Sequence, residues 1–185
     1  MPPPPPSPPL SFTHPPALSP FTLPAAHILT HHPTPLTGVA TAAVVFDPHG
    51  RVLLLQRAAH DSMPNLWEVP GGAVDADDPS ILHGALRELW EEAGLRGTVV
   101  VGFIPEREVQ GQGDGKDGEE EEELVRKGLT FSFTNREGVF KTFYRLAFEV
   151  QVEGGEGGVE VRLDPGEHQD YGMFALPPQS STFRE

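Results

Sequence analysis

Proline is concentrated at one end of this 185-residue chain: 13 of its 21 prolines lie in the first 36 residues, and no lysine, arginine, aspartate or glutamate precedes Asp47. Proline has no backbone N–H and fixes φ, so runs of it neither continue a helix nor pair inside a sheet. We therefore expect residues 1–36 to be a mostly disordered tail, in which residues 24–32 form one or two helical turns against a domain. The tail is either a ligand for a proline-recognising domain or, more commonly for such sequences, an extended solvated end.

The sequence after the proline-rich end is long enough for one globular domain and too short for two. We expect a single domain at residues 37–176 and a short polar tail at residues 177–185. Cysteine is absent from the chain, which excludes disulfides, zinc–thiolate sites and thiol nucleophiles. Any bound metal must therefore be held by oxygen or imidazole ligands.

The charge balance restricts the partners of this domain. The chain has 13 basic and 27 acidic residues and a net charge of −14, which repels nucleic acid polymers but still allows a small phosphorylated molecule that binds with a cation. No apolar run approaches the roughly 18 residues of a membrane span, and the proline-rich end lacks the basic and apolar parts of a targeting signal. We expect a cytoplasmic protein that binds neither nucleic acid polymers nor membranes, in an oligomeric state that the sequence leaves open.

Apolar and β-branched runs after residue 37 predict strands. Residues 39–46 and 52–55, joined by turn-forming residues 47–50, predict a β-hairpin. Further strands are predicted at residues 66–69, 97–104, 129–134, 140–152, 159–163 and 171–175. Between them, residues 111–128 include five consecutive glutamates and are expected to form an acidic, mobile loop insertion. The alternative, a trap for divalent ions, is disfavoured because a uniform acidic run lacks the fixed geometry of a selective site.

A helix is predicted at residues 79–93. Asp78 suits its N-cap, Pro79 its first position and Gly94 its left-handed stop. Four apolar residues fall on one stripe of this helix, which we expect to pack on the core: Leu82, Leu86, Leu89 and Ala93.

The opposite side of this helix carries Glu88, Glu91 and Glu92. Their like charges repel, and each such pair weakens an isolated helix by roughly 0.2–0.5 kcal/mol. A bound Mg²⁺ would compensate, because it prefers carboxylate oxygens and accepts phosphate oxygens as further ligands. The alternative interpretation is an acidic helix face that is simply solvated. The sequence around the helix favours the metal site over this alternative.

The sequence around this helix resembles the signature of the Nudix hydrolases. That signature is a Gly, five residues, a Glu, seven residues, and then Arg-Glu-apolar-x-Glu-Glu-x-Gly-apolar. Residues 87–95, Arg-Glu-Leu-Trp-Glu-Glu-Ala-Gly-Leu, match its second half at every defined position. The first half departs, because five residues separate Gly72 from Asp78, which stands in place of the Glu, and eight residues rather than seven separate Asp78 from Arg87. We interpret Asp78 as the helix N-cap rather than as a catalytic residue.

The resemblance extends over residues 37–175 and implies an α/β/α sandwich around a mixed β-sheet, with the signature as a loop–helix–loop unit at one edge. Many family members close with a second helix, whereas this chain ends soon after residue 175, and residues 24–32 are the candidate substitute. The implied activity is Mg²⁺-dependent hydrolysis of the pyrophosphate bond in a small molecule, a nucleoside diphosphate linked to another group. The alternative is a catalytically weak or inactive Nudix-fold module that binds a nucleotide or a protein.

The resemblance also implies roles for individual residues. Glu88, Glu91, Glu92 and the carbonyl of Gly72 would hold Mg²⁺ or Mn²⁺. Arg87 would brace the glutamates through charge-assisted hydrogen bonds.

The general base is left with several candidates. Glu88 is one, and Glu167, in a loop beyond the signature, is another, with Glu160 as second choice. An exposed turn glutamate is the alternative interpretation of Glu167. We interpret His168 as a surface histidine, with a base or a metal ligand as the alternative.

Overall fold

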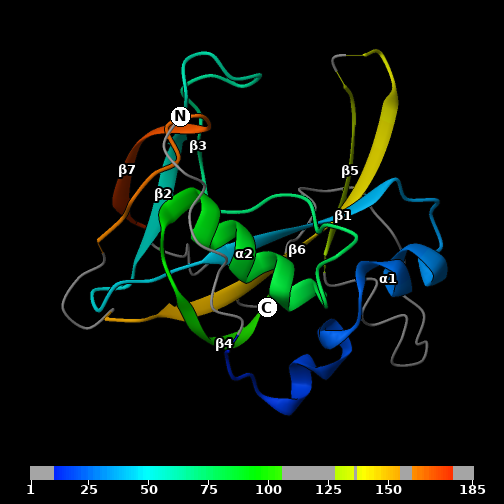
Figure 1. Cartoon of the computed structure of the whole chain (residues 1–185), viewed down its shortest axis with the longest axis horizontal. Helices are drawn as coiled ribbons and strands as arrows, with labels where there is room; N and C mark the ends of the chain where they lie inside the picture. The colour runs from blue at the N-terminus through cyan, green and yellow to red at the C-terminus, as the bar shows by residue number, and fades with distance from the viewer. Residues whose placement is uncertain (1–10, 106–127, 136, 155–159, 177–185) are drawn as a thin grey trace, which may run out of the picture.

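The computed structural model describes residues 11–105, 128–135, 137–154 and 160–176 (Figure 1). The predicted loop insertion at residues 111–128, except for its last residue, and the predicted tail at residues 177–185 lie outside these ranges. In chain order the elements are the 3₁₀ helix η1 (Pro16–Thr22), α1 (Ala25–His31), β1 (Gly38–Val44), β2 (Arg51–Arg57), β3 (Trp67–Glu68), α2 (Ile81–Ala93), β4 (Gly97–Ile104), β5 (Leu129–Thr134), β6 (Phe140–Val152) and β7 (His168–Ala175).

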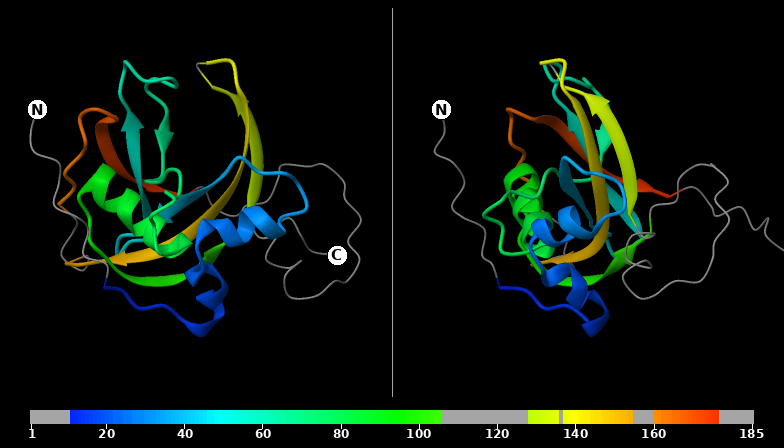
Figure 2. Two further views of the ribbon diagram at one scale, coloured as in Figure 1. Left: turned by 45° about the vertical axis from the view of Figure 1, so that its right-hand side comes forward. Right: turned by 90° about the vertical axis from the view of Figure 1, so that its right-hand side faces the viewer.

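The strands form two sheets within one α/β domain (Figures 1 and 2). The larger has the order β1-β6-β4, with β5 also paired to β6, and it is mixed because β1 runs parallel to β6 while β4 and β5 run antiparallel to it. The smaller sheet has the order β3-β2-β7 and is antiparallel. The predicted α/β fold with a mixed sheet is confirmed.

The predicted hairpin between β1 and β2 is wrong in its pairing. The two strands and their connecting turn are present, but β1 pairs with β6 and β2 pairs with β3 and β7. Between β1 and β2 the structure shows one isolated bridge, Phe46 with Val52, and a hydrogen bond from the N–H of Leu53 to the carbonyl of Val45 (2.9 Å). A local turn signal does not reveal which distant strand completes each ladder.

Part of the segment predicted as a tail belongs to the domain. Leu18, Phe21 and Ile28 are buried, and the ring of Phe21 stacks on Phe103 with centroids 5.5 Å apart. The helical turns predicted at residues 24–32 are confirmed as α1. The expectation of a mostly disordered tail is therefore wrong from residue 11 onward, because proline at the start of η1 is compatible with a short helix and apolar residues spaced between prolines supply the buried face.

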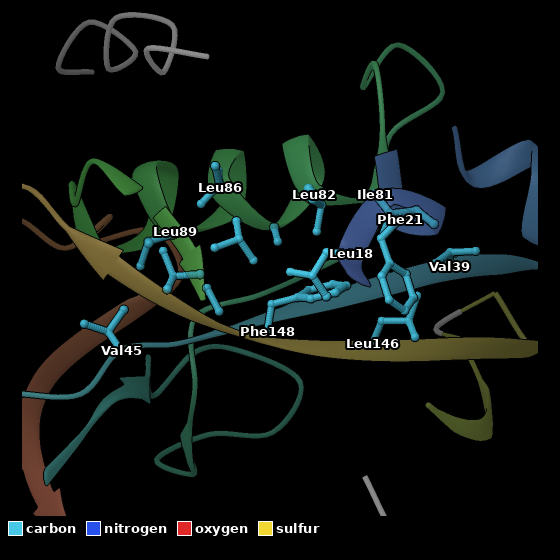
Figure 3. Close-up of a cluster of buried hydrophobic side chains, with 14 of the residues drawn as sticks. Leu18, Phe21, Val39, Val45, Ile81, Leu82, Leu86, Leu89, Leu146 and Phe148 are labelled. Atoms are coloured by element: carbon cyan, nitrogen blue, oxygen red, sulfur yellow. The ribbon is translucent and has the colours of Figure 1, made fainter. Parts of the chain in front are cut away.

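The core fixes the orientation of α2. Leu82, Leu86 and Leu89 point from α2 toward Leu146 and Phe148 of β6 in one buried cluster (Figure 3). The predicted apolar stripe is thus confirmed, and the side of α2 that carries the glutamates is turned away from this part of the core. No helix of the described residues is long and apolar enough to cross a membrane.

The two ends of α2 differ in how well they were predicted. Gly94 adopts the left-handed conformation (φ 66°), as predicted, and its N–H donates to the carbonyl of Trp90. The N-cap is Ser80, whose hydroxyl accepts the N–H of His83 at 3.3 Å, so the prediction of Asp78 as N-cap is wrong. Asp78 is buried and its carboxylate binds other groups, described below.

The predicted strand at residues 159–163 is wrong over its described part. Residues 160–163 have no regular secondary structure, although Val161 and Leu163 pack against the main core. The N–H of Arg162 donates to the carbonyl of Ala93 at 2.8 Å. These residues therefore cover the C-terminal end of α2 instead of joining a sheet.

Candidate active site

A glycine turn brings the end of β3 against both β1 and α2. Residues 70–74 run alongside β1, with the N–H of Thr41 donating to the carbonyl of Gly72 at 2.8 Å. A Cβ on Gly71 would lie 2.2 Å from the carbonyl oxygen of Thr41, and one on Gly72 would lie 2.7 Å from the carboxylate of Glu88. Only glycine fits at these two positions without moving β1 or the carboxylate.

A cavity of about 490 Å³ opens beside this turn. Four of the residues predicted for the site, Gly72, Glu88, Glu92 and Glu167, line it, although they come from three separate segments of the chain. The full lining is Arg57, His60, Asp61, Gly71, Gly72, Ala73, Glu88, Glu92, Gly166, Glu167 and His168. The cavity is therefore a meeting point of carboxylates from α2 and from the segment that begins β7.

Glu92 is the most deeply buried of these carboxylates, with 5% of its surface exposed. Its Oε2 accepts the N–H of Gly71 at 2.7 Å. Burial raises the pKa of Glu92 to about 9, and the charges of Glu88, Glu167 and Glu68 act in the same direction against that hydrogen bond. The site thus holds a carboxyl group that is unfavourable as an anion unless a cation accompanies it.

Glu88 lies one helical turn before Glu92. Burial raises its pKa to about 7, against the opposing effect of the Arg87 guanidinium, whose Nη1 lies 3.0 Å from Oε1 of Glu88. The neighbouring charges of Glu91 and Glu167 raise the pKa further. Two carboxyl groups on adjacent turns therefore share one desolvated, negatively charged environment.

Arg87 joins α2 to the loop before it. Its guanidinium donates to both carboxylate oxygens of buried Asp78 at 3.0–3.3 Å and to the carbonyl of Ala73 at 2.8 Å. Burial lowers the pKa of Arg87, but the bonds to Asp78 and the charges of Asp78 and Glu88 outweigh it and raise the pKa overall. Arg87 also contacts two of the glutamates, Glu88 at 3.0 Å and Glu91 at 2.8 Å, and Asp78 is its most buried charged partner.

Glu91 differs from the other two glutamates of α2. Its carboxylate accepts a hydrogen bond from Nη1 of Arg87 at 2.8 Å, its side chain is 45% exposed, and it does not line the cavity. The carbonyl of Gly72 already accepts the N–H of Thr41, which uses one of its two lone pairs. Of the four predicted metal ligands, only Glu88 and Glu92 place carboxylates on the cavity wall.

The first residue of β7, His168, and the residue before it, Glu167, supply two further groups. Glu167 is exposed, and a carboxylate oxygen of Glu167, one of Glu92 and a ring nitrogen of His168 all lie within 4.8 Å of one another. Glu160, the second choice for the base, is exposed and does not line the cavity. The geometry thus favours Glu167 over Glu160 as the group that reaches the site.

Sequence reasoning misjudged one residue beside these carboxylates and missed others. His168 is 2% exposed, so its interpretation as a surface histidine is wrong. Arg57, at the end of β2, donates to Glu68 at 2.6 Å and forms an ion pair with Asp61. For Arg57, the sequence shows only that an arginine follows an apolar strand. For His168, no local pattern indicates that β7 lies beside β2.

Comparison with known proteins gives short sequence matches. The chain is 46% identical to the m7GpppN-mRNA hydrolase NUDT17 of Homo sapiens over 55 residues, which cover 29% of this chain and 16% of that protein. It is 38% identical to the CTP pyrophosphohydrolase of Escherichia coli (strain K12) over 61 residues, which cover 33% of this chain and 44% of that protein. These alignments span less than half of either relative.

Comparison of the fold covers more of the molecule. The MutT protein from Methanosarcina mazei Go1 superposes with a TM-score of 0.52 at 22% sequence identity, over 75% of this chain and 76% of that chain. The MutT Nudix hydrolase from Burkholderia pseudomallei superposes with a TM-score of 0.50 at 20% identity, over 76% of this chain and 86% of that chain. The family model of the NUDIX domain matches residues 36–177. With this match over most of its length, and with the signature helix and glycine turn in place, the chain belongs to the Nudix family.

Proposed function

We propose that this protein is a divalent-metal-dependent hydrolase that cleaves the pyrophosphate bond of a nucleoside diphosphate linked to another group. The observation that carries the proposal is the convergence of Glu88, Glu92 and Glu167 on one cavity, where burial and mutual repulsion raise the pKa values of Glu88 and Glu92. Perturbed carboxyl groups that meet in a cavity are typical of catalytic sites.

The donor groups suit a hard divalent cation. Carboxylate oxygens are the ligands that Mg²⁺ and Mn²⁺ prefer, and a cation would make the anionic forms of Glu88 and Glu92 favourable in their buried positions. Such an ion, when bound, supplies charge neutralisation for phosphate oxygens and lowers the pKa of bound water. Glu91 would contribute indirectly, because its contact with Arg87 helps to hold the guanidinium beside Glu88.

Glu167 is our candidate for the general base. It is exposed and lines the cavity, so its carboxylate can reach an attacking water and take a proton from it. The water oxygen would form a bond to phosphorus, the phosphoanhydride P–O bond would break, and the leaving phosphate would carry away the bonding electrons. Glu88 is the other candidate, with a pKa near neutrality.

Aromatic side chains support a nucleoside as part of the substrate. Phe131 and Phe143 pair across β5 and β6, with rings 6.1 Å apart, and the ring of Phe133 lies 5.8 Å from that of Phe143. Phe143 is on the same face of β6 as Ala147, which belongs to one buried cluster with Val52 of the smaller sheet. This face of the larger sheet is therefore the one that is turned toward the smaller sheet (Figure 2).

The smaller sheet carries aromatic rings on the corresponding face. Trp67 and Phe174 lie with ring centroids 4.8 Å apart and remain 39% and 38% exposed. Phe174 pairs with Val52, so its side chain is on the face of β2 that packs toward the larger sheet. Partly exposed rings on two facing sheets suit the stacking of a nucleobase. Two relatives are named as a hydrolase of m7GpppN-mRNA and as a pyrophosphohydrolase of CTP, which is consistent with this substrate class.

The proposal is tested by incubating the protein with nucleoside triphosphates, nucleotide sugars and dinucleoside polyphosphates, with and without Mg²⁺ or Mn²⁺, and measuring released phosphate after a coupled phosphatase. We expect metal-dependent turnover of at least one compound and a loss of more than about 100-fold in Glu92→Gln. Glu153→Gln, an exposed glutamate paired with Arg96, is the matched control and should keep full activity. Tight nucleotide binding without turnover would instead support an inactive binding module.

A further inference from the structure

His168 is a buried imidazole that the proposed reaction does not use. It begins β7 and lines the cavity, although only 2% of its surface is exposed. A ring in this position has lost its water and must find partners inside the protein.

One ring nitrogen of His168 has such a partner. Nε2 lies 3.1 Å from Oε1 of Glu68, and an N–H that faces a carboxylate donates to it. Glu68 is itself fixed by Arg57, whose Nη1 donates to the same Oε1 at 2.6 Å. The contact therefore holds the ring in place and assigns its proton to Nε2 in the neutral form.

The other nitrogen, Nδ1, is buried and has no hydrogen-bond partner in the part of the chain that the structure describes. With the proton on Nε2, Nδ1 carries a free lone pair. A buried lone pair without a partner is unfavourable unless a cation or a donor completes it. Carboxylate oxygens of Glu92 and Glu167 lie within 4.8 Å of one of the two ring nitrogens of His168 and of each other.

This arrangement has the form of a metal-bound histidine. Histidines that bind metals commonly donate their second nitrogen to a carboxylate, which fixes the tautomer and makes the first nitrogen a stronger ligand. Here Glu68 is that carboxylate, and Glu92 and Glu167 are the oxygen donors beside the ring. Imidazole nitrogen also changes which metals are favoured, because Mn²⁺ and later transition metals accept it more readily than Mg²⁺ does.

We propose that His168 is a metal ligand through Nδ1, together with Glu92, and that it makes this site bind Mn²⁺ in preference to Mg²⁺. The inference rests on the proposed metal dependence of the site and goes beyond it, because it adds a nitrogen donor and names the preferred ion. Glu68 and Arg57 act as positioning residues for the ring.

The test uses the 185-residue chain loaded with Mn²⁺ and measures nitrogen coupling to the ion by pulsed electron paramagnetic resonance. We expect ¹⁴N coupling of a directly bound imidazole in the wild-type protein, its loss in His168→Gln, and its retention in His60→Gln. His60 is the matched control, since it lines the same cavity but its Nε2 faces the carbonyl of Gly166 at 3.1 Å. Calorimetric titration should show Mn²⁺ affinity reduced about tenfold or more in His168→Gln, with Mg²⁺ affinity changed far less.

The wild-type spectrum decides the inference without any variant, so poor folding of His168→Gln would leave it testable. Bound Mn²⁺ without ¹⁴N coupling would overturn it, as would coupling that survives in His168→Gln and disappears in His60→Gln. If either result is found while metal-dependent hydrolysis continues, the proposed function stands and only the assignment of His168 as a metal ligand is wrong. A protein that neither binds Mn²⁺ nor hydrolyses any compound would overturn both proposals.

Discussion

For the single residue Glu92, the position that suits a metal ligand is unfavourable for the stability of the metal-free fold. Its carboxyl group is buried beside Glu88 and close to Glu167, and a single hydrogen bond from Gly71 offsets only part of the cost of its negative charge. At neutral pH and without a cation, the raised pKa of Glu92 favours a proton on its carboxyl group in the folded protein, whereas the unfolded chain would release that proton. Strain of this kind is typical of sites that are completed by a ligand.

This proton gives a pH dependence that can be measured. The pKa of Glu92 is about 9 in the folded protein and near 4.5 when unperturbed, so the folded state binds more protons between these values and its stability falls as pH rises through that window. Glu92→Gln removes the titrating group. We therefore expect metal-free Glu92→Gln to be more stable than wild type at pH 8 by roughly 1–3 kcal/mol in denaturant unfolding.

Metal should reverse this order. With millimolar Mg²⁺ or Mn²⁺ the wild-type protein gains stability from a bound ion that Glu92→Gln binds poorly. Unfolding curves of both proteins in chelator and in metal provide the comparison. Equal stability of the two proteins at pH 8 in chelator would show that Glu92 is not held in an unfavourable ionisation state.

Gly72 is a second residue whose role can be isolated. A Cβ there would lie 2.7 Å from the carboxylate of Glu88, whereas a Cβ on Gly102 would meet no atom within 4 Å. We expect Gly72→Ala to displace Glu88 and reduce kcat by about 100-fold, and Gly102→Ala to leave it unchanged. Steady-state kinetics on the substrate found in the screen would measure both, with thermal melts to show that the two variants are folded.

At the scale of the element, the sequence predicted the body of α2 better than its start. Four regularly spaced apolar residues and Gly94 determined the buried face and the end of the helix. At the start, Asp78 and Ser80 are both good N-caps by residue type, and the tertiary contact with Arg87 is what removes Asp78 from that role. The extra residue between Asp78 and Arg87, relative to the family signature, is accommodated because the carboxylate still reaches the guanidinium.

Substitutions of Ser80 and of Asp78, the two hydrogen-bond acceptors at this end of α2, should therefore differ in their effect on stability and turnover. Ser80→Ala removes a helix cap and is expected to lower the free energy of unfolding by about 1 kcal/mol with little change in activity. Asp78→Ala leaves the Arg87 guanidinium without its main partner and is expected to cost about 3 kcal/mol and to reduce turnover. Denaturant unfolding and steady-state kinetics measure both effects, and a larger loss in Ser80→Ala would contradict our assignment.

At the scale of the whole molecule, long-range pairing and burial limited what the sequence could reveal. The run of residues 39–46 was identified as a strand, but its partner β6 lies about a hundred residues further along the chain. Glu88, Glu92 and Glu167 were identified as candidates from the family signature and loop position, whereas the burial of His168 depends on the pairing of β7 with β2. Residue type and spacing are local properties, and these contacts are not.

The N-terminal segment offers a test of the domain boundary. Phe21 is 2% exposed between Phe103 and Phe148, while the neighbouring Leu23 is 39% exposed. We expect Phe21→Ala to lower the free energy of unfolding by about 3–5 kcal/mol and Leu23→Ala by much less. If chemical denaturation gave equal and small effects for both, residues 16–22 would not be part of the cooperative core.

The proposed hydrolysis requires a divalent cation among the carboxylates of α2, and a crystal of the protein grown with Mn²⁺ would locate that ion. We predict an anomalous scattering peak in the cavity within ligand distance of Glu92, beside Glu88. An empty cavity in such a crystal, with both carboxylates contacting only protein and water while hydrolysis of a nucleoside diphosphate derivative still proceeds, would show that these carboxylates do not hold a catalytic metal.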